Sequence, residues 1–213
     1  MKRAVALPAA LLAGVLHTAA FAPTYFWWLQ ILALAGLAWL ARDASPRRAA
    51  ALGAAFGIGW LCSGLWWLHI SMHQFGHIPS PLAALAVLLL AAFLSLYYAG
   101  ALALAARMSG RWRVAVWAAC WLLAELARAS FFSGFPWLAS GYAHSVGPLA
   151  AWAPWIGVYG IATLAAAAAA SLAALAQGRW RSALVVTLII AAGSGLPQDF
   201  TTSTGSLRVS LLQ

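Results

Sequence analysis

The side chains that could take part in chemistry are few in this sequence, and the most informative of them lie between residues 125 and 142. Glu125 is the only glutamate of the chain, and Arg128 follows three residues later. Residues at this spacing share one face of a helix, so each can neutralise the other at a membrane depth where a lone charge is costly. Two interpretations stay open: a polar anchor for a lipid headgroup or a neighbouring domain, and a structural ion pair that fixes the helix end.

An aromatic corner follows the charged pair. Gly134-Phe135-Pro136-Trp137 combines a flexible glycine, a stiff proline and two large aromatic rings, and Tyr142 lies shortly beyond. This composition suits contact with acyl chains, and we take Phe135, Pro136, Trp137 and Tyr142 as the candidate substrate or lipid contacts. The alternative is an ordinary aromatic belt at the membrane interface, which the spacing alone favours.

Three histidines recur at a spacing of four residues. His69, His73 and His77 would stack on one face if a single helix carried them all. Gly76 and Pro79 argue against such a helix, and no carboxylate lies nearby to accept a hydrogen bond from the ring nitrogen that faces away from a metal. We therefore predict no metal site here, and the sequence offers no sign of a cofactor.

Neither cysteine is predicted to be a nucleophile. Cys62 and Cys120 both lie inside apolar runs, where a thiol ionises poorly and behaves as a small hydrophobic group. The chain has only three acidic residues, and it contains neither a Ser-His-Asp set nor a phosphate-binding loop. A self-sufficient acid and base site is hard to assemble from these residues, so we predict no catalytic residue within this sequence.

The composition of the chain indicates which kind of secondary structure carries these side chains. Hydrophobic residues make up 65% of the 213 residues and charged residues 7%, far from the balance of a soluble domain. The net charge of +9 comes from bases dispersed in small groups between apolar runs, which argues against a nucleic-acid partner. We predict an all-α polytopic membrane protein whose partner is the bilayer.

About seven transmembrane helices are predicted from the apolar runs. The first run could instead be a cleaved signal peptide, because Ala20-Phe21-Ala22 resembles a cleavage site, but it leads directly into the second and we favour a retained helix. Residues 131–148 are too broken by Gly and Pro to form one helix and are predicted to be a structured loop. The predicted helices cover residues 4–20, 25–41, 49–70, 81–106, 114–130, about 149–176 and 182–196.

The distribution of bases predicts the orientation. With a cytoplasmic N-terminus, ten of the twelve Lys and Arg residues fall in cytoplasmic segments, and only Arg128 and Arg208 do not. The corner and the C-terminal tail then lie on the outer side of the membrane.

Several motifs together resemble the membrane part of the apolipoprotein N-acyltransferase family, and their order along nearly the whole chain makes the resemblance specific. They are Phe21-Ala22-Pro23, Gly64-Leu65-Trp66-Trp67-Leu68 with Ser71 and Phe75-Gly76, Glu125 with Arg128, Gly134-Phe135-Pro136-Trp137, Gly141-Tyr142, Gly157-Val158-Tyr159-Gly160, and a final segment, residues 207–213, that resembles the first strand of the family's soluble domain.

The resemblance implies acyl transfer at the outer face of the bacterial inner membrane. In this family a nitrilase-like domain uses a Glu-Lys-Cys triad to take a fatty acyl chain from a phospholipid, the acyl donor, and pass it to the N-terminal amine of diacylglyceryl-cysteine in a lipoprotein, the acceptor. This is the final step of lipoprotein maturation. The resemblance gives Phe135, Pro136 and Trp137 a place near the acyl-chain entrance.

The same resemblance implies that the catalytic triad lies beyond Gln213. We expect a transmembrane domain over residues 1–196, and a periplasmic linker with the first strand of a truncated nitrilase-like domain over residues 197–213. An unpaired strand is not independently stable, so this chain is expected to be a fragment. Because the triad lies outside it, the fragment is expected to be inactive alone. We also expect a monomer. The competing hypothesis is a noncatalytic membrane protein, such as a small carrier or scaffold.

Overall fold

The computed structural model describes residues 5–108, 110, 112–197, 200–202, 204–206 and 209–210, and the regular structure of these residues is entirely helical. This confirms the all-α prediction. The main helices are α1 (Ala6–Thr18), α2 (Trp27–Ala41), α3 (Pro46–Gly64), α4 (Trp66–Ile70), α5 (Ser80–Arg107), α6 (Arg113–Ser130), α7 (Ala153–Leu175) and α8 (Trp180–Ala192). Shorter turns are the π-helical η2 (Ser71–Phe75) and the 3-10 turns η3 (Phe131–Ser133), η4 (Ser140–His144), η5 (Ala150–Trp152) and η6 (Gly193–Gly195).

Among the described residues, three helices are long and apolar enough to cross a membrane: Ser80–Arg107, Arg113–Ser133 and Ala150–Leu175, the last two counted with their flanking turns. A fourth candidate is the bent pair of Pro46–Gly64 with Trp66–Phe75. The other three apolar helices, α1, α2 and α8, are shorter than the ~20 residues that usually span a bilayer core. Each predicted apolar run corresponds to a helix or helix pair, whereas the number of spans, seven, stays a prediction.

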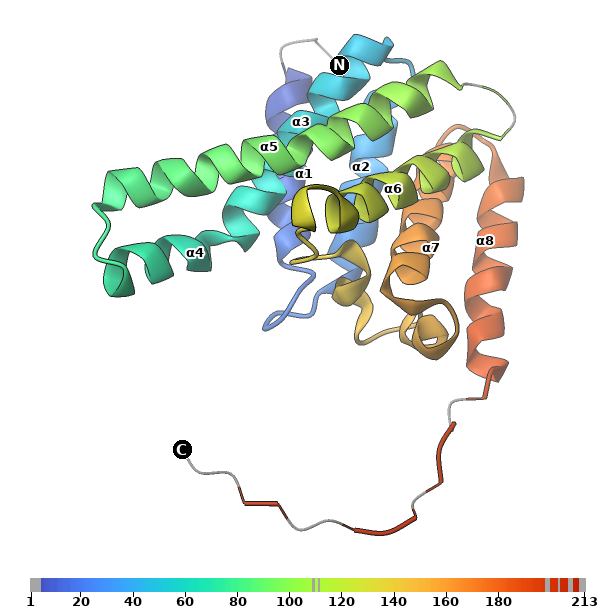
Figure 1. The fold of residues 1–213 in the computed structure, drawn as a ribbon. Helices are drawn as coiled ribbons and strands as arrows, with labels where there is room; N and C mark the ends of the chain where they lie inside the picture. The colour runs from blue at the N-terminus through green and yellow to red at the C-terminus, as the bar shows by residue number, and fades with distance from the viewer. Residues whose placement is uncertain are drawn as a thin grey trace.

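The predicted third helix, residues 49–70, is wrong in one respect, because the chain bends by 50° between α3 and α4. Gly64 ends α3 and packs against the side chain of Leu138, and the next residue, Leu65, leaves helical geometry with its side chain fully buried. Trp66 and Trp67 then emerge exposed. In Figure 1, α4 and the first half of α5 extend together beyond the bundle as an arm.

Small residues allow α1, α3 and α5 to approach closely. A side chain at Gly14 of α1 would overlap the backbone of α3 at Phe56, and one at Gly53 of α3 would lie 2.5 Å from the carbonyl oxygen of Tyr98 in α5. Backbones in such contact gain dispersion energy without losing side-chain entropy. α1 is part of this packing, and the retention of the first helix stays a prediction.

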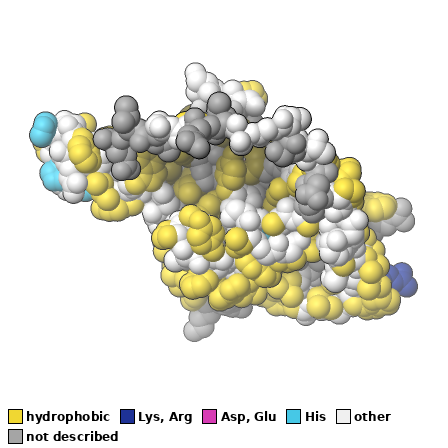
Figure 2. Space-filling model, turned by 90° about the horizontal axis from the view of Figure 1, so that it is seen from below, with side chains coloured by type: hydrophobic (Ala, Val, Ile, Leu, Met, Phe, Trp, Pro, Cys, Tyr) yellow, Lys and Arg dark blue, Asp and Glu magenta, His cyan; other side chains and the backbone are white. Residues whose placement is uncertain are grey.

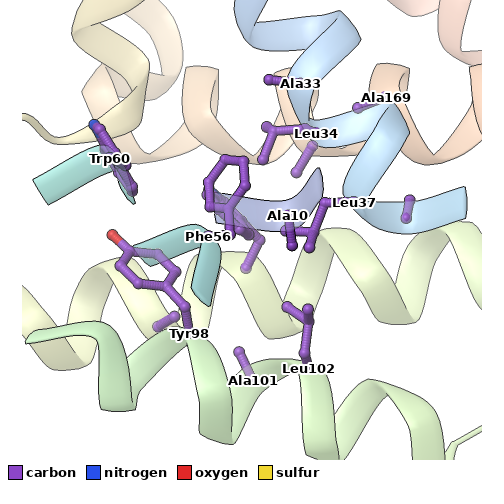
Figure 3. Packing of buried hydrophobic residues seen from close by; sticks show 14 of the residues in the cluster. Ala10, Ala33, Leu34, Leu37, Phe56, Trp60, Tyr98, Ala101, Leu102 and Ala169 are labelled. Atoms are coloured by element: carbon purple, nitrogen blue, oxygen red, sulfur yellow. The ribbon is translucent and has the colours of Figure 1, made fainter. Parts of the chain in front are cut away.

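The core described here lies where α1, α2, α3, α5, α6 and α7 meet. Figure 3 shows Phe56 and Trp60 of α3 near Tyr98 and Leu102 of α5, with Leu34 and Leu37 of α2 and the alanines of α1 and α7 around them. The ring of Trp60 lies 5.2 Å from that of Tyr98 and 6.3 Å from that of Trp121 in α6. On the other side, the buried alanines of α7 let it pack against α2 and α6.

The expected C-terminal strand, residues 207–213, lies for the most part outside the described residues. Val209 and Ser210, which are described, have no regular secondary structure.

Candidate functional site

Glu125 and Arg128 form an ion pair inside the bundle, with 3.2 Å between Arg128 Nη2 and Glu125 Oε2. The α6 helix places both side chains on its buried face, where they are 0% and 1% exposed. Ions removed from water are retained only when hydrogen bonds satisfy them well. Glu125 meets this requirement, because its Oε1 accepts from Tyr98 Oη at 2.7 Å and its Oε2 accepts from the backbone N–H of Ser140 at 3.1 Å.

Arg128 ties the ion pair to the aromatic corner. One terminal nitrogen of its guanidinium group, Nη1, donates to the carbonyl oxygen of Phe135 at 2.8 Å and to that of Trp137 at 2.7 Å. The backbone N–H of Phe135 donates in turn to the carbonyl oxygen of Arg128 at 2.8 Å. The guanidinium carbon also lies 5.7 Å from the ring centroid of Trp60. The guanidinium group of Arg128 therefore holds the corner's backbone and is not presented to a ligand.

Ser140, three residues after the corner, also binds to the neighbouring helices. Besides its N–H bond to Glu125, its hydroxyl accepts from Trp121 Nε1 at 3.0 Å and its carbonyl oxygen accepts from Gln30 Nε2 at 2.6 Å. These partners come from α6 and α2, and all of these side chains are buried. Helices distant in sequence thus determine the position of one loop residue.

The corner's backbone follows a path that few sequences allow. Phe132, Ser133 and Leu138 have φ of 54°, 72° and 58°, and Gly134 has φ of 78°. A side chain at Gly134 would overlap the carbonyl group of Ala129. Non-glycine residues in this region cost of order 1–3 kcal/mol each and persist only where surrounding contacts hold them. The bonds of Glu125 and Arg128 to the backbone of Phe135, Trp137 and Ser140 hold the chain on both sides of Leu138.

The corner presents aromatic rings outwards. Trp137 is 59% exposed and Tyr142 is 60% exposed, and Pro136 is also exposed. Phe135, the fourth predicted contact residue, is half-buried and packs against the core. The ring of Trp137 meets that of Trp67, from the start of α4, edge to face at 5.7 Å between centroids. Three of the four candidate residues therefore offer surface to a ligand, and Phe135 mainly anchors them.

Other residues of this site were not singled out from the sequence. Phe132 is 83% exposed and its ring lies 5.5 Å from that of Phe93 in α5, which extends the aromatic surface towards the arm. Tyr98 and Gln30 complete the buried network. For Gln30 the available signal was a single amide side chain within an otherwise apolar helix, and Tyr98, which has Ser95 and Tyr97 beside it in α5, gave no such signal. Figure 2 looks onto the end of the bundle that carries the corner, and hydrophobic side chains cover much of the described surface there.

The three spaced histidines lie at the end of the arm and do not form one helical stripe. His69 stacks on Trp66 at 4.4 Å and its Nε2 lies 3.1 Å from Ser80 Oγ, while His73 Nδ1 lies 2.8 Å from the carbonyl oxygen of Ile78. His77 adopts φ of 52°, outside helical geometry. Within the described part of the chain, no group of three potential metal ligands comes together.

His144 is a buried group of the loop that follows the corner. It is 1% exposed, its ring lies 6.0 Å from that of Trp27, and neither ring nitrogen has a partner among the described residues. Burial lowers its pKa from 6.5 to about 4. The imidazole is therefore neutral at neutral pH and serves packing.

The chemistry that this arrangement can perform is binding and positioning. Its carboxylate is fully buried and accepts three hydrogen bonds, and its outward groups are aromatic rings. Cys62 lies half-buried in α3 and Cys120 lies buried in α6, both packed with the core. An exposed aromatic surface on a backbone held by buried charges can bind an apolar group.

Comparison with known proteins places the chain in context. The family model described as "Apolipoprotein N-acyltransferase N-terminal domain" matches residues 13–171. The chain is 49% identical over 197 residues to an apolipoprotein N-acyltransferase of Ralstonia nicotianae, covering 88% of this chain and 38% of that protein. For the enzyme of the same name in Chromobacterium violaceum the identity is 39% over 203 residues, covering 92% of this chain and 39% of the relative. The chain thus spans less than half the length of these relatives.

Proposed function

The chain belongs to the apolipoprotein N-acyltransferase family, and on this premise we propose that it is the membrane-embedded part of an enzyme that acylates lipoproteins. The proposed reaction moves a fatty acyl chain from a phospholipid to the N-terminal amine of diacylglyceryl-cysteine. A thiolate attacks the donor's ester carbonyl, the lysophospholipid leaves, and a thioester forms. The acceptor amine then attacks the thioester, forms the amide and releases the thiol.

We assign no residue of this chain to the covalent steps. Cys62 and Cys120 lie within helices among apolar side chains, and the carboxylate of Glu125 is engaged by Tyr98, Arg128 and Ser140. The Glu-Lys-Cys triad of the proposed reaction therefore belongs to protein outside these residues. Residues 1–213 by themselves are expected to show no acyl transfer.

The role proposed for this chain is to position lipid substrates at the corner. One observation carries this proposal. The buried Arg128 donates hydrogen bonds to the carbonyl oxygens of Phe135 and Trp137, immediately beside exposed aromatic rings. A fixed aromatic surface loses little conformational entropy when an acyl chain packs on it, which favours binding.

The proposed location is the bacterial inner membrane, with the corner and the C-terminal tail on the periplasmic side. The proposed enzyme is a monomer. Support comes from Arg42, Arg113 and Arg179, which lie at helix ends beside three separate connections yet line one cavity. The bases of these connections thus gather at one end of the bundle, and the positive-inside rule assigns such an end to the cytoplasm. The corner belongs to the opposite end, since Glu125 lies twelve residues, or ~18 Å of helix, beyond Arg113 along α6.

A chimera tests the proposal. Residues 1–213 replace the matching N-terminal region of the Ralstonia nicotianae enzyme, and the chimera is expressed in bacteria depleted of their own apolipoprotein N-acyltransferase. We expect growth to be restored, with mature triacylated lipoproteins. A chimera that is inserted at normal levels but leaves lipoproteins diacylated contradicts the proposed function and favours a noncatalytic carrier or scaffold.

Two matched substitutions in the chimera test the corner. Trp137→Ala removes an exposed ring of the corner, and Trp180→Ala removes a ring of similar exposure, 57% against 59%, at the start of α8. Slower growth is expected for Trp137→Ala alone. Unchanged complementation by Trp137→Ala would count against a substrate role for the corner.

A further inference from the structure

A cavity of about 400 Å³ lies at the base-rich end of the bundle, far from the aromatic corner. The ends of α2, α5 and α7 and the beginning of α6 surround it. Its deeper wall is apolar and includes Leu102, Ala106 and Ala173, and its rim carries Arg42, Arg113 and Arg179. A cavity with an apolar wall and a cationic rim is suited to an amphipathic anion.

The charge of the rim is not neutralised by the protein. Three guanidinium groups and one carboxylate, that of Asp43, line the cavity, which leaves a net charge of +2. Asp43 pairs with Arg42 at 3.2 Å, and Arg42 also stacks on Trp39 at 3.9 Å and donates to its carbonyl oxygen. Arg113 and Arg179 have no carboxylate partner in the described part of the chain. Two guanidinium groups are therefore available to an external anion.

A second observation points to a ligand at the same place. Trp117, one turn of α6 beyond Arg113, lines the cavity and is buried, and its indole N–H has no acceptor among the described residues. Buried donors are nearly always satisfied in folded proteins. The cavity wall thus includes an indole whose N–H is itself buried and is satisfied by no described residue.

We propose that this cavity binds the phosphate group of an anionic phospholipid, with Arg113 and Arg179 contacting the phosphate and the lipid's glycerol and upper acyl chain lying against the alanine-rich wall. Guanidinium groups bind phosphate oxygens with charge-assisted hydrogen bonds. Basic pockets between transmembrane helices recognise lipid headgroups in this way. The inference is independent of the proposed acyl transfer, because no residue of the corner takes part in it.

The chemistry favours a lipid over a free phosphate ion. An inorganic phosphate ion gains nothing from the apolar wall, whereas a lipid buries part of its glycerol and chain there. The net positive charge also favours an anionic lipid over a zwitterionic one, since the headgroup amine of a zwitterionic lipid cancels its phosphate charge.

Native mass spectrometry of residues 1–213 in detergent tests the proposal by titration with phosphatidylglycerol, with phosphatidylcholine, and with phosphatidylglycerol in an excess of inorganic phosphate. The variant Arg113→Gln/Arg179→Gln removes two charges from the cavity. The matched control Arg47→Gln/Arg48→Gln removes two charges from a neighbouring surface of the same end, which these arginines share with Asp43 and Ser45. Arg179→Gln alone alters an exposed side chain and leaves folding unaffected.

We expect phosphatidylglycerol to bind at least tenfold more tightly than phosphatidylcholine and to resist displacement by phosphate. Loss of two charge-assisted contacts should weaken this binding by about tenfold or more, the single variant by an intermediate factor, and the control by less than about threefold. Equal binding of the two lipids, equal losses in variant and control, or no loss in either overturns the proposal. Displacement of the lipid by phosphate overturns the lipid as the ligand.

Discussion

Replacing Arg128 with alanine removes the group that neutralises Glu125 and holds two carbonyl oxygens of the corner. The carboxylate of Glu125 is 0% exposed, so it cannot recover the lost interaction from water. Breaking a buried ion pair by removing one partner typically costs about 3–5 kcal/mol. The carbonyl oxygens of Phe135 and Trp137 also lose their donor, at about 1 kcal/mol each when they stay buried. We expect Arg128→Ala to lower the free energy of unfolding by about 5–7 kcal/mol.

The double variant Glu125→Gln/Arg128→Met separates charge from shape. It removes both charges together and retains most of the side-chain volume, so no uncompensated ion stays in the bundle. Its cost should be at least about 2 kcal/mol smaller than that of Arg128→Ala. Arg181→Ala, at an exposed position in α8, is the control and should lie within about 0.5 kcal/mol of the parent.

The assay is reversible unfolding in mixed micelles, followed by tryptophan fluorescence and by circular dichroism. A change below about 1 kcal/mol for Arg128→Ala would refute the reasoning, because a buried charge cannot be left unpaired at so small a cost. If the double variant is as unstable as Arg128→Ala, the unpaired carboxylate of Glu125 is not the main cause of the lost stability.

Three further predictions address packing, pH and the cysteines. Gly14→Val should lower the free energy of unfolding by about 1–3 kcal/mol or more, since its side chain overlaps the backbone of α3, whereas Gly36→Ala, with open space around it, should not destabilise in the same micelle assay. Because the pKa of His144 is about 4 in the folded chain and 6.5 unfolded, the unfolded state gains the proton first and stability falls as pH drops from 6.5 to 4. His144→Gln should remove roughly 3 kcal/mol of that decline, and unfolding curves parallel to the parent's across this range would contradict the assignment. Cys62→Ala/Cys120→Ala should leave complementation by the chimera unchanged, and lost acylation by a normally inserted protein would give a thiol of this chain a part in the reaction.

Apolar runs between clusters of arginine predicted the positions of most helices. They did so because burial in a bilayer requires continuous hydrophobic segments, and this requirement is local in the sequence. The bend after Gly64 was not predicted, since Leu65, Trp66 and Trp67 continue the apolar run without any change of composition. What bends the chain is tertiary, because Leu138 packs against Gly64 from a loop more than seventy residues away.

The spacing of Glu125 and Arg128 predicted that the two side chains lie together, which the geometry of a helix ensures. The hydrogen-bond partners of these two side chains could not be predicted from the sequence. Tyr98 comes from another helix, and the bonds to Phe135, Trp137 and Ser140 use the backbone, whose donors and acceptors every residue shares. The half-buried state of Phe135 was hidden for the same reason, because no local pattern tells which aromatic ring of a turn points inwards.

The most direct test of the account is the steady-state kinetics of the purified chimera with a diacylated lipopeptide and a phospholipid donor. The corner is held to bind lipid substrate, so Trp137→Ala should lower kcat/KM by about fivefold to tenfold, about 1–1.4 kcal/mol, mainly through a higher KM. Trp180→Ala should leave both constants unchanged. Equal kinetics for the parent and Trp137→Ala, or an equal loss for the two variants, would contradict the assignment of the corner as a substrate-positioning surface.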